Sequence, residues 1–307
     1  MADFSIHTLG CGSAKPTLRH QPSSTVIDFR NNLFMIDCGE GTQYAMQRQR
    51  LRFSRLGHIF LTHLHGDHVL GLPGLISTMA LQNAGGSITI HTFEEGKRIL
   101  QEILGFFARE LPFTVEYDII DPDRESVVYD SKSISVRTVP LHHRVPAVGY
   151  VFEEKSRQRH LLRDMCDFHG VPLYLFNSIK DGADFERADG KVIPNGLLTS
   201  DPTPPLSYAH ISDTAYSPGL AEKIGPVTLL FHETTYLDRN LAEAAPRGHS
   251  TARQAAVTAR DAGAKWLITG HYSARYDSDE EFRTEALEEF PNVILNREGL
   301  VTDLTKL

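Results

Sequence analysis

The chain has 307 residues, of which 41% are hydrophobic and 23% are charged, and its formal net charge is −8. This composition is typical of a globular protein with enough apolar residues for a large core. The negative charge argues against a general nucleic-acid coat, because phosphate binding depends on Lys and Arg, but a local basic patch remains compatible with it. The first residues lack the pattern of a signal peptide, no apolar run is long enough to span a bilayer, and three widely spaced cysteines do not suggest a disulfide framework. We therefore expect a cytoplasmic protein with no membrane segment.

The first half of the chain is predicted to open with the strand 4–9, which is followed by a hairpin of the strands 25–29 and 33–36. Asn31 and Asn32 form a suitable turn pair for that hairpin. Pro73 is expected in the first turns of its helix or at a kink within it. Strands are predicted at 4–9, 25–29, 33–36, 59–61, 87–92, 113–120, 126–130 and 134–139, and helices at 39–51, 68–82 and 95–110.

The second half repeats one pattern three times: an apolar strand followed by a polar turn. The strands 206–211, 227–231 and 266–269 lead into 212–214, 232–233 and 270–271, and helices at 251–262 and 278–290 alternate with them. Polar groups at the ends of parallel strands gather at one edge of a sheet, where open α/β proteins keep their sites. We infer two sheets sandwiched between helices.

A segment from about 152 to 205 fits neither half. It is rich in charge, then in Pro and Gly, and has little sustained periodicity. A loop of this length in a compact domain is usually functional or disordered. A solvated connector and a functional insertion remain equally open.

The most informative motif is the run THLHGDH at 62–68, directly after the apolar stretch 59–61. Neutral imidazole nitrogen and carboxylate oxygen are the ligands that zinc and similar divalent ions prefer. A tight turn between a strand and a helix allows His63 and His65 to face one metal ion while Asp67 and His68 face a second. A polar loop that is His-rich by chance is the weaker interpretation.

Further candidate ligands follow other predicted strands. His142 and His143 follow one strand, and Asp213 and His271 each follow another. Any of these residues alone is more often a cap or a surface polar group. Together with the first motif, one of the two neighbouring histidines, Asp213 and His271 bring the number of ligands to seven. Seven ligands suit two ions that share one carboxylate and each keep an open position.

The order of motifs resembles the ribonuclease Z family of the metallo-β-lactamase superfamily over nearly the whole chain. The motifs that carry this resemblance are LGCGSA at 9–14, DCGEGTQ at 37–43, HETT at 232–235, HSTA at 249–252 and HYSARY at 271–276. In that family the ligand lies seven residues before the Tyr of a Gly-Tyr pair, which here is Tyr150. The resemblance therefore selects His143 rather than His142.

The resemblance implies an α/β fold, the metallo-β-lactamase αββα sandwich, as one domain over 1–307 with an inserted exosite-like arm at about 152–205. It implies a homodimeric, zinc-dependent endoribonuclease that cuts tRNA precursors at the 3′ side and leaves a 3′-hydroxyl and a 5′-phosphorylated trailer. One Zn²⁺ would be held by His63, His65 and His143, the other by Asp67, His68 and His271, and both by Asp213. Manganese is the alternative ion.

The resemblance also implies three catalytic roles. Asp67 would orient the attacking water and accept its proton, His249 would protonate the leaving 3′ oxygen, and Glu233 would hold the His249 imidazole. His249 could instead be a helix N-cap, because Ser250 and Thr251 open a predicted helix. A dinuclear-metal hydrolase of small substrates is the alternative function, and a non-catalytic binding subunit is disfavoured because every ligand position is filled.

Two stretches depart from the family pattern. The family's arm often has a Gly-Pro-rich tip, whereas 170–176 here reads GVPLYLF. Cationic residues could still contact phosphates from the arm, namely Lys155, Arg157, Arg159 and Arg163. The loop 16–20 reads PTLRH where the family often has P-x-K-x-R, which leaves the preference for precursor over mature tRNA ends open.

Overall fold

The computed structural model describes residues 3–82, 86–108 and 110–307. Contacts between residues divide the chain into two compact units, which we call the core unit and the arm unit. The core unit comprises Met1–Asp130, Ser135–Phe152 and Leu206–Leu307, and the arm unit comprises Ser131–Ile134 and Glu153–Pro205.

The first sheet of the core unit has the order β18-β1-β2-β3-β4-β5-β6. Its strands are β1 (Phe4–Gly10), β2 (Ser24–Phe29), β3 (Asn32–Ile36), β4 (Leu56–Phe60), β5 (Ser87–Thr92), β6 (Thr114–Ile119) and β18 (Val301–Asp303). Strands β18 to β3 pair antiparallel, and β3 to β6 pair parallel. The parallel half brings the carboxyl ends of β3, β4 and β5 to one edge.

The second sheet has the order β17-β16-β15-β14-β9-β8-β7. Its strands are β7 (Val127–Asp130), β8 (Ile134–Pro140), β9 (Val148–Glu154), β14 (Ser207–Ile211), β15 (Leu229–Glu233), β16 (Trp266–Gly270) and β17 (Val293–Leu295). Strands β14 to β17 are parallel, so the polar residues that follow β14, β15 and β16 lie at a common edge.

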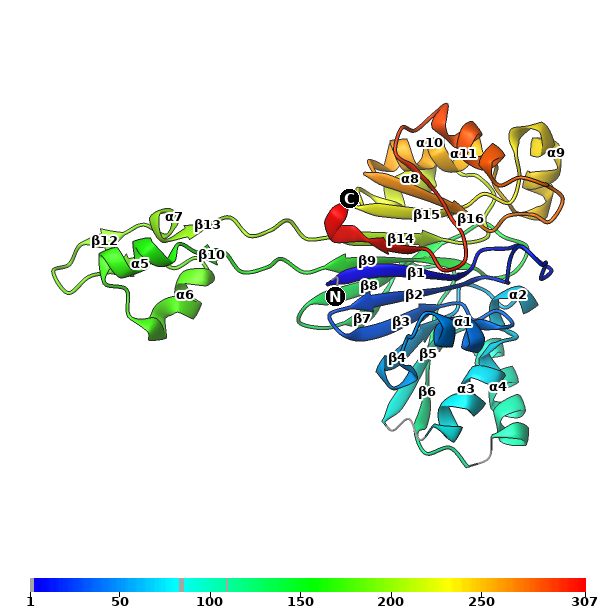
Figure 1. Cartoon of the computed structure of the whole chain (residues 1–307), viewed down its shortest axis with the longest axis horizontal. Helices are drawn as coiled ribbons and strands as arrows, with labels where there is room; N and C mark the ends of the chain where they lie inside the picture. Colours follow the sequence, from blue (N-terminus) through cyan, green and yellow to red (C-terminus); the bar gives the residue numbers. More distant parts are fainter. Residues whose placement is uncertain (1–2, 83–85, 109) are drawn as a thin grey trace. The chain divides into compact units, whose positions relative to one another are not determined.

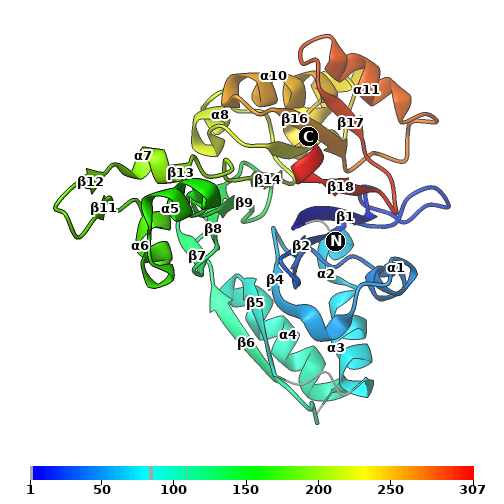
Figure 2. The same ribbon diagram turned by 60° about the vertical axis from the view of Figure 1, so that its left-hand side comes forward.

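The helices of the core unit cover the outer faces of the two sheets (Figures 1 and 2). Beside the first sheet lie α1 (Thr42–Arg48), α2 (Gly66–Val69), α3 (Leu72–Leu81) and α4 (Glu94–Phe107), and beside the second lie α8 (Gly219–Ile224), α9 (Leu241–Ala244), α10 (Ala252–Ala262) and α11 (Glu280–Leu287). Short 3₁₀ helices lie at η1 (Phe53–Arg55), η3 (Asp238–Asn240), η4 (Ala245–Arg247) and η5 (Leu304–Lys306). Within the described ranges, every helix falls short of the length and apolarity that a bilayer-spanning helix requires.

The two sheets pack face to face through aromatic rings. The Phe152 ring of β9 lies 5.4 Å from the Phe60 ring of β4 and 6.0 Å from the Phe34 ring of β3, between ring centroids. On the outer faces, α3 and α4 bury apolar side chains with the first sheet, and α8, α10 and α11 bury theirs with the second. The predicted αββα sandwich is confirmed: the central strands are buried on both faces, as such layers require, and the edge strands β6 and β7 are partly exposed.

The predicted hairpin turn and the helix predicted at 68–82 differ from the structure. The hairpin turn consists of Arg30 and Asn31, both with positive φ, and Asn32 already pairs with Phe29. A two-residue turn with positive φ at both positions matches the twist of the strands, which moves the turn one residue earlier than predicted. The helix predicted at 68–82 is two helices, α2 and α3, with Pro73 in the first turn of α3. A side chain at Gly71 would meet the Gly39 carbonyl at 2.0 Å, so the break allows a close approach of two backbones.

The arm unit is folded rather than an extended connector. Its elements are β10 (His160–Leu161), α5 (Arg163–His169), η2 (Leu173–Leu175), α6 (Phe176–Lys180), β11 (Phe185–Glu186), β12 (Val192–Ile193), α7 (Asn195–Leu198) and β13 (Thr199–Ser200), with β10 paired to β13 and β11 to β12. A small core of its own holds them together: Cys166, Val171, Ile179, Phe185, Ile193 and Leu198.

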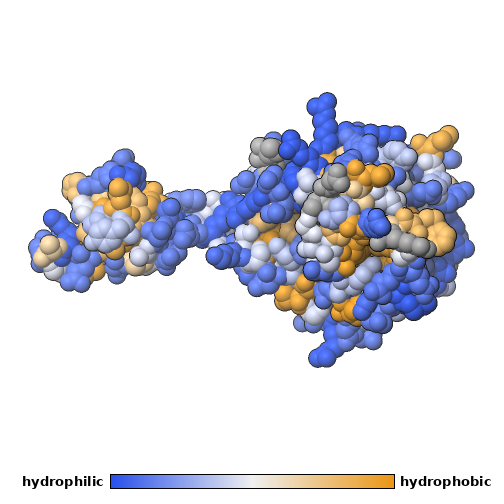
Figure 3. All heavy atoms as spheres, turned by 90° about the horizontal axis from the view of Figure 1, so that it is seen from below, coloured by the Kyte–Doolittle hydropathy of each residue, from blue (hydrophilic) through white to orange (hydrophobic). Residues whose placement is uncertain are grey.

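The surface of the arm unit combines apolar side chains with charge pairs. Phe168 and Tyr174 are 79% and 81% exposed, and apolar surface lies among hydrophilic side chains in Figure 3. All three arginines that were proposed for phosphate contacts have carboxylate partners within the unit. Arg157 pairs with Glu154, Arg159 with Asp201, and Arg163 with Asp167, each with a nitrogen–oxygen distance of 2.9 Å. These three cations therefore do not form an unpaired basic patch.

Candidate metal centre

The turn after β4 carries the predicted ligands His63 and His65, and α2, which follows it directly, carries Asp67 and His68. Asp37, the residue after β3, holds this turn in place. Its Oδ1 accepts the Thr62 N–H and its Oδ2 accepts the Thr62 hydroxyl, both at 2.8 Å. Asp37 is fully buried and has a φ of 57°, a conformation that non-glycine residues rarely adopt. The sequence analysis named Asp37 only as part of a motif. The one pattern that could have indicated its role is a single carboxylate directly after a buried strand.

The first donor group consists of His63, His65 and His143. The distance from His63 Nε2 to His65 Nδ1 is 3.1 Å, and that from His65 Nδ1 to His143 Nε2 is 3.3 Å. Asp213 Oδ2 lies 3.6 Å from His63 Nε2 and 3.9 Å from His143 Nε2. His142, in contrast, is exposed, and its backbone N–H binds the Thr214 hydroxyl.

The second donor group consists of Asp67, His68 and His271. The two Nε2 atoms of His68 and His271 are 3.2 Å apart, and each lies 3.5 Å from Asp67 Oδ2. Asp213 faces this group with its other oxygen: Oδ1 lies 3.2 Å from His271 Nε2 and 3.7 Å from His68 Nε2. The structure thus brings all seven predicted ligands together, with Asp213 between the two donor groups.

The outward nitrogens of four imidazoles are each held by an oxygen. His143 Nδ1 donates to the Gly248 carbonyl and His68 Nδ1 to Asp37 Oδ2, at 2.8 and 2.7 Å. His63 Nδ1 and His271 Nδ1 lie 3.1 and 2.9 Å from hydroxyl oxygens, those of Thr62 and Thr235. This arrangement fixes the tautomer that turns an Nε2 lone pair toward the donor group, as in metal-binding histidines. Facing lone pairs about 3 Å apart repel unless a cation lies between them, so the residues fit metal ions.

The electrostatics of the two donor groups support the same conclusion. Burial and the neighbouring His68 hold the pKa of His63 well below its usual range, which keeps its imidazole neutral and able to bind a metal. Burial alone would lower the pKa of His68, but the carboxylates of Asp37, Asp213 and Asp67 outweigh it and raise the pKa to about 10. The buried carboxylates therefore attract positive charge, which a proton supplies when no metal is bound.

Glu233 and His249 form a hydrogen-bonded pair beside the donor groups. Glu233 ends β15, so the predicted polar turn begins two residues later than expected. Its Oε1 accepts His249 Nδ1–H at 3.1 Å and the Ser250 N–H at 2.8 Å, and its Oε2 accepts the Thr235 hydroxyl at 2.6 Å. Burial lowers the pKa of His249, but Glu233 and Asp213 outweigh it and raise the pKa to about 9.

The alternative role of His249 as a helix N-cap is wrong. Thr251 caps α10, with its hydroxyl accepting the Gln254 N–H and the Gln254 side chain accepting the Thr251 N–H. This capping box satisfies the start of the helix without His249. The His249 imidazole therefore remains available to face the site.

A cationic pocket opens beside His249. Its volume is about 420 Å³, and it is lined by Ser13, Ala14, Lys15, Arg144, Thr235, Tyr236, Arg247, His249, Ser273, Ala274 and Arg275. The guanidinium of Arg275 lies 4.9 Å from the centre of the Tyr236 ring, and Arg247 donates to the Tyr236 hydroxyl at 3.0 Å. Arg275 and Arg247 both contact Glu243, at 2.9 and 3.9 Å, so one carboxylate faces two of the four cations of the pocket. The pocket keeps an excess of positive charge in a chain with a net charge of −8, which fits a polyanionic substrate. The sequence did not single out this cluster, because its cations lie far apart along the chain.

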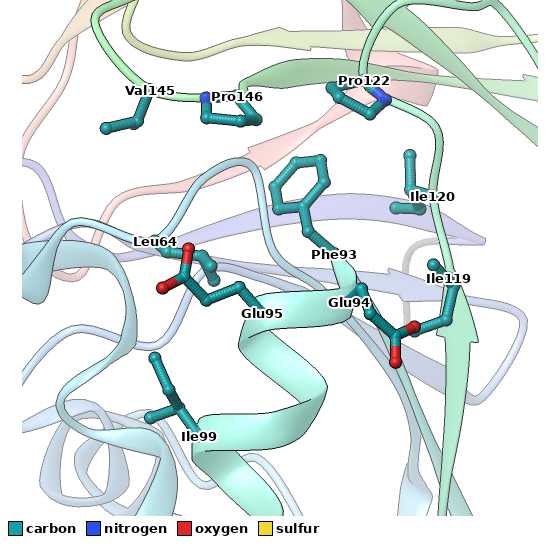
Figure 4. Close-up of a pocket in the computed structure, with 10 residues that line it drawn as sticks. All are labelled: Leu64, Phe93, Glu94, Glu95, Ile99, Ile119, Ile120, Pro122, Val145 and Pro146. Carbon is teal, nitrogen blue, oxygen red and sulfur yellow. The ribbon is translucent and has the colours of Figure 1, made fainter.

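A second pocket, of about 490 Å³, has none of the proposed metal ligands in its lining (Figure 4). It is lined by Leu64, Phe93, Glu94, Glu95, Ile99, Ile119, Ile120, Pro122, Val145 and Pro146. Leu64 separates His63 from His65, so this pocket adjoins the first donor group through its backbone. Its apolar walls and two carboxylates do not suit a phosphate, which belongs in the cationic pocket.

Comparison with known proteins gives relatives of nearly equal length. Ribonuclease Z of Parabacteroides distasonis is 47% identical over 300 residues, 98% of this chain and 99% of that protein. Ribonuclease Z of Porphyromonas gingivalis is 47% identical over 304 residues, 99% of this chain and 100% of that protein. The family model of the anti-Pycsar protein Apyc1 matches residues 4–109.

Solved structures share the fold. The short form of human tRNase Z aligns with a TM-score of 0.70 at 23% identity and covers 98% of this chain and 99% of that one. The metallo-β-lactamase-fold protein YhfI from Bacillus subtilis aligns with a TM-score of 0.68 at 14% identity, with the same coverage. At these identities the likeness establishes the architecture alone.

Proposed function

This chain belongs to the ribonuclease Z family, a metal-dependent group of endoribonucleases, and from that premise we propose that it uses two Zn²⁺ ions to cut tRNA precursors at the 3′ side. The proposed cut leaves a 3′-hydroxyl on the tRNA and a 5′-phosphate on the trailer. The observation that carries the proposal is the position of Asp213. Its two oxygens face two separate donor groups, beside a histidine that is paired with a buried carboxylate.

The two donor groups suggest which residues would bind each ion. His63, His65 and His143 would hold one ion, Asp67, His68 and His271 the other, and Asp213 both. Five imidazoles and two carboxylates favour zinc, with manganese as the alternative. Two bound ions supply Lewis-acid stabilisation of the phosphate charge and make water nucleophilic at neutral pH.

Asp67 would orient the attacking water. Its Oδ2 accepts the Ala14 N–H at 2.7 Å, which fixes the carboxylate. Burial raises the pKa of Asp67, but His271 and His68 outweigh burial and lower it below its usual range. Asp67 therefore stays ionised, accepts a hydrogen bond from the water and holds the released proton only transiently.

His249 would protonate the leaving group. Its Nδ1–H donates to Glu233, which leaves Nε2–H for the 3′ oxygen of the tRNA. As water attacks phosphorus and the bond to the 3′ oxygen breaks, the Nε2 proton moves to that oxygen. Acid catalysis of this kind contributes roughly 10²- to 10⁴-fold to the rate.

The cationic pocket and the arm unit are the proposed RNA contacts. Arg144, Arg247 and Arg275 would bind backbone phosphates near the cut. The folded arm unit would act as an exosite, with exposed Phe168 and Tyr174 as its contact side chains.

We also propose a cytoplasmic homodimer. Support for an interface comes from exposed apolar residues on α3 and α4, Leu81, Phe106 and Phe107, which are 69–86% exposed.

Hydrolysis of a small substrate remains the second candidate, because the two donor groups and His249 would serve a small phosphodiester as well, and the cationic pocket of about 420 Å³ has the size of a small-molecule site. One experiment separates the two. The protein is incubated with precursor tRNA, with mature tRNA and with a small phosphodiester, and the RNA ends are sequenced. Cleavage of the precursor at one position at the 3′ side, reduced in His249→Ala and retained in His142→Ala, supports the tRNA function. Cleavage of the small ester alone would overturn it.

A further inference from the structure

A separate group of side chains of the types that bind metals shares no residue with the proposed zinc centre. Cys11 follows β1, His20 ends the opening loop, and Glu298 lies between β17 and β18. His20 Nδ1 lies 3.5 Å from Cys11 Sγ and 3.2 Å from Glu298 Oε2, and all three donor atoms lie within 4.8 Å of one another. Cys11 and His20 are buried, whereas the Glu298 side chain is 24% exposed.

Glycines allow these segments to meet. A side chain at Gly12 would meet His20 Cβ at 2.7 Å, and one at Gly10 would meet the Pro22 carbonyl at 1.9 Å. The opening loop therefore folds back against the end of β1 at a distance that only glycine permits. Cys11, between the two glycines, is brought against His20 as a result.

The spacing of the donors matches that around a metal ion. A tetrahedral zinc ion, with bonds of about 2.3 Å to sulfur and about 2.1 Å to nitrogen and oxygen, separates sulfur from nitrogen by about 3.6 Å and nitrogen from oxygen by about 3.4 Å. The observed separations are 3.5 and 3.2 Å, and the donor groups of the zinc centre show similar values, from 3.1 to 3.9 Å.

A carboxylate behind His20 completes the pattern. His20 Nε2 lies 2.9 Å from Asp279 Oδ2, so its N–H donates to Asp279. Metal-binding histidines usually donate their outer N–H to a carboxylate in this way. Glu298 is fixed as well, because its Oε1 accepts the Gln21 N–H at 2.9 Å. With Nε2 protonated, His20 Nδ1 faces a carboxylate oxygen and a sulfur, and this contact requires either a proton on Nδ1 or a cation between the atoms.

We propose that Cys11 Sγ, His20 Nδ1 and Glu298 Oε2 bind a third divalent metal ion of the zinc class, with Asp279 as the carboxylate that orients His20. The exposed side of Glu298 leaves the fourth position to water. This ion would tie the opening loop to the chain near its last strands. The same loop donates the Ala14 N–H to Asp67 Oδ2 at 2.7 Å, so the ion would stabilise a contact of the zinc centre without touching its ligands.

Protons compete with the ion at this site. Hydrogen bonds to Asp279 and Glu298 raise the pKa of His20 to about 9, and burial and Glu298 raise the pKa of the Cys11 thiol well above its usual range. Without metal, His20 is therefore an imidazolium and Cys11 a thiol at neutral pH. Binding of one ion releases two protons, one from Cys11 Sγ and one from His20 Nδ1, as metal sites with thiolate ligands do. The competing interpretation is a charged cluster without a metal ion.

Cobalt substitution tests the third site directly. The purified full chain is stripped of metal, loaded with Co²⁺, and examined for bound ions per chain and for a thiolate-to-cobalt charge-transfer band in the near ultraviolet. The zinc centre offers only His and Asp, so a band that disappears in Cys11→Ser reports Cys11 as a ligand. We expect three ions and the band in the wild type, and two ions without the band in Cys11→Ser. The matched control is Cys166→Ser, which removes another buried cysteine and should keep both.

A second variant keeps the proposal testable if Cys11→Ser does not fold. Asp279→Asn retains all three donors and removes only the carboxylate behind His20. It should weaken binding of the third ion by about 10- to 100-fold and keep the charge-transfer band at saturation. Folded wild-type protein that binds only two ions and shows no thiolate band would overturn the proposal and leave the charged cluster as the explanation. A band that persists in Cys11→Ser would overturn it as well.

Discussion

The metal-binding edge of the core unit and the surface of the arm unit arrange their charged groups in opposite ways. At the edge, buried imidazoles and carboxylates from distant strands point at common centres, so their charges require an ion. In the arm unit, Arg163 and Asp167 neutralise each other on one exposed helix. The segment 153–205 has seven Lys and Arg against nine Asp and Glu, a net charge of −2. Buried groups that converge on one point therefore identify a chemical site, whereas locally paired charges mainly keep a surface solvated.

Removal of the shared carboxylate should have the largest effect. Asp213→Ala takes one oxygen from each donor group, and we expect metal content to fall from two ions per chain toward none and cleavage of precursor tRNA to become undetectable. Metal analysis and a cleavage assay measure both effects. Asp201→Ala, in the arm unit, is the matched control: it breaks a pair with Arg159 that is largely exposed and should leave metal content unchanged. Two ions retained in Asp213→Ala would contradict the shared position.

The neighbouring histidines give the next test. His143→Ala removes a donor whose Nε2 lies 3.3 Å from His65 Nδ1, so at least one ion and nearly all cleavage should be lost. His142→Ala removes an exposed side chain and should change neither by more than about twofold. Comparison of the two variants separates loss of a metal ligand from disturbance of the local backbone, because the two positions lie in the same loop. Equal losses in both variants would place the metal ligand in doubt.

Loss of His249 should reduce the rate and spare the metals. His249→Ala should retain two ions and cleave precursor tRNA about 10²- to 10⁴-fold more slowly, because the leaving 3′ oxygen then receives no proton from the protein. A phosphodiester with a nitrophenol leaving group needs no such proton and should lose far less. Comparison of the two substrates in the same preparation measures this difference. Equal losses on both would indicate that His249 acts through the metal centre and not on the leaving group.

Much of the metal-binding edge could be predicted because its ligands lie within a few residues of the end of an apolar strand, or in the short helix α2 that follows β4. His63 and Asp213 were found from that pattern, and the sequence could count seven ligands. The choice of His143 over His142 came from the family resemblance, since both follow the same strand. Asp37 received no role, because a carboxylate after a strand gives no sign in the sequence that it will accept bonds from Thr62 and His68 in a separate turn.

The arm unit could not be predicted from periodicity. Its helices have four to seven residues and its strands have two, too short for a repeat of 3.6 or 2 to become visible. Its core is built from single apolar residues such as Cys166 and Leu198, which meet only when the segment folds. The same limit applies to the cationic pocket, where Lys15 and Arg275 come from opposite ends of the chain.

Removal of the arm should have the smallest effect on the hydrolysis of a small phosphodiester and should selectively reduce the cleavage of precursor tRNA. Replacement of 153–205 by a short linker leaves every proposed ligand in place. Hydrolysis of the nitrophenyl phosphodiester should persist, because it depends on the metals alone. Precursor tRNA uses remote contacts to position one phosphate among many, so its kcat/KM should fall by roughly 10- to 100-fold, mainly through KM.

The salt dependence of that loss distinguishes phosphate contacts of the arm from base contacts. The arm's paired arginines and net charge of −2 predict that it contributes few phosphate contacts, so the loss should be nearly constant as salt rises. Its exposed rings predict contacts with bases instead, each worth about 1–3 kcal/mol. With the arm intact, Phe168→Ser combined with Tyr174→Ser should therefore raise KM more than Arg163→Ala combined with Asp167→Ala. The reverse order, with a loss that varies steeply with salt, would mean that the ion pairs open to bind phosphate and that the arm works electrostatically after all.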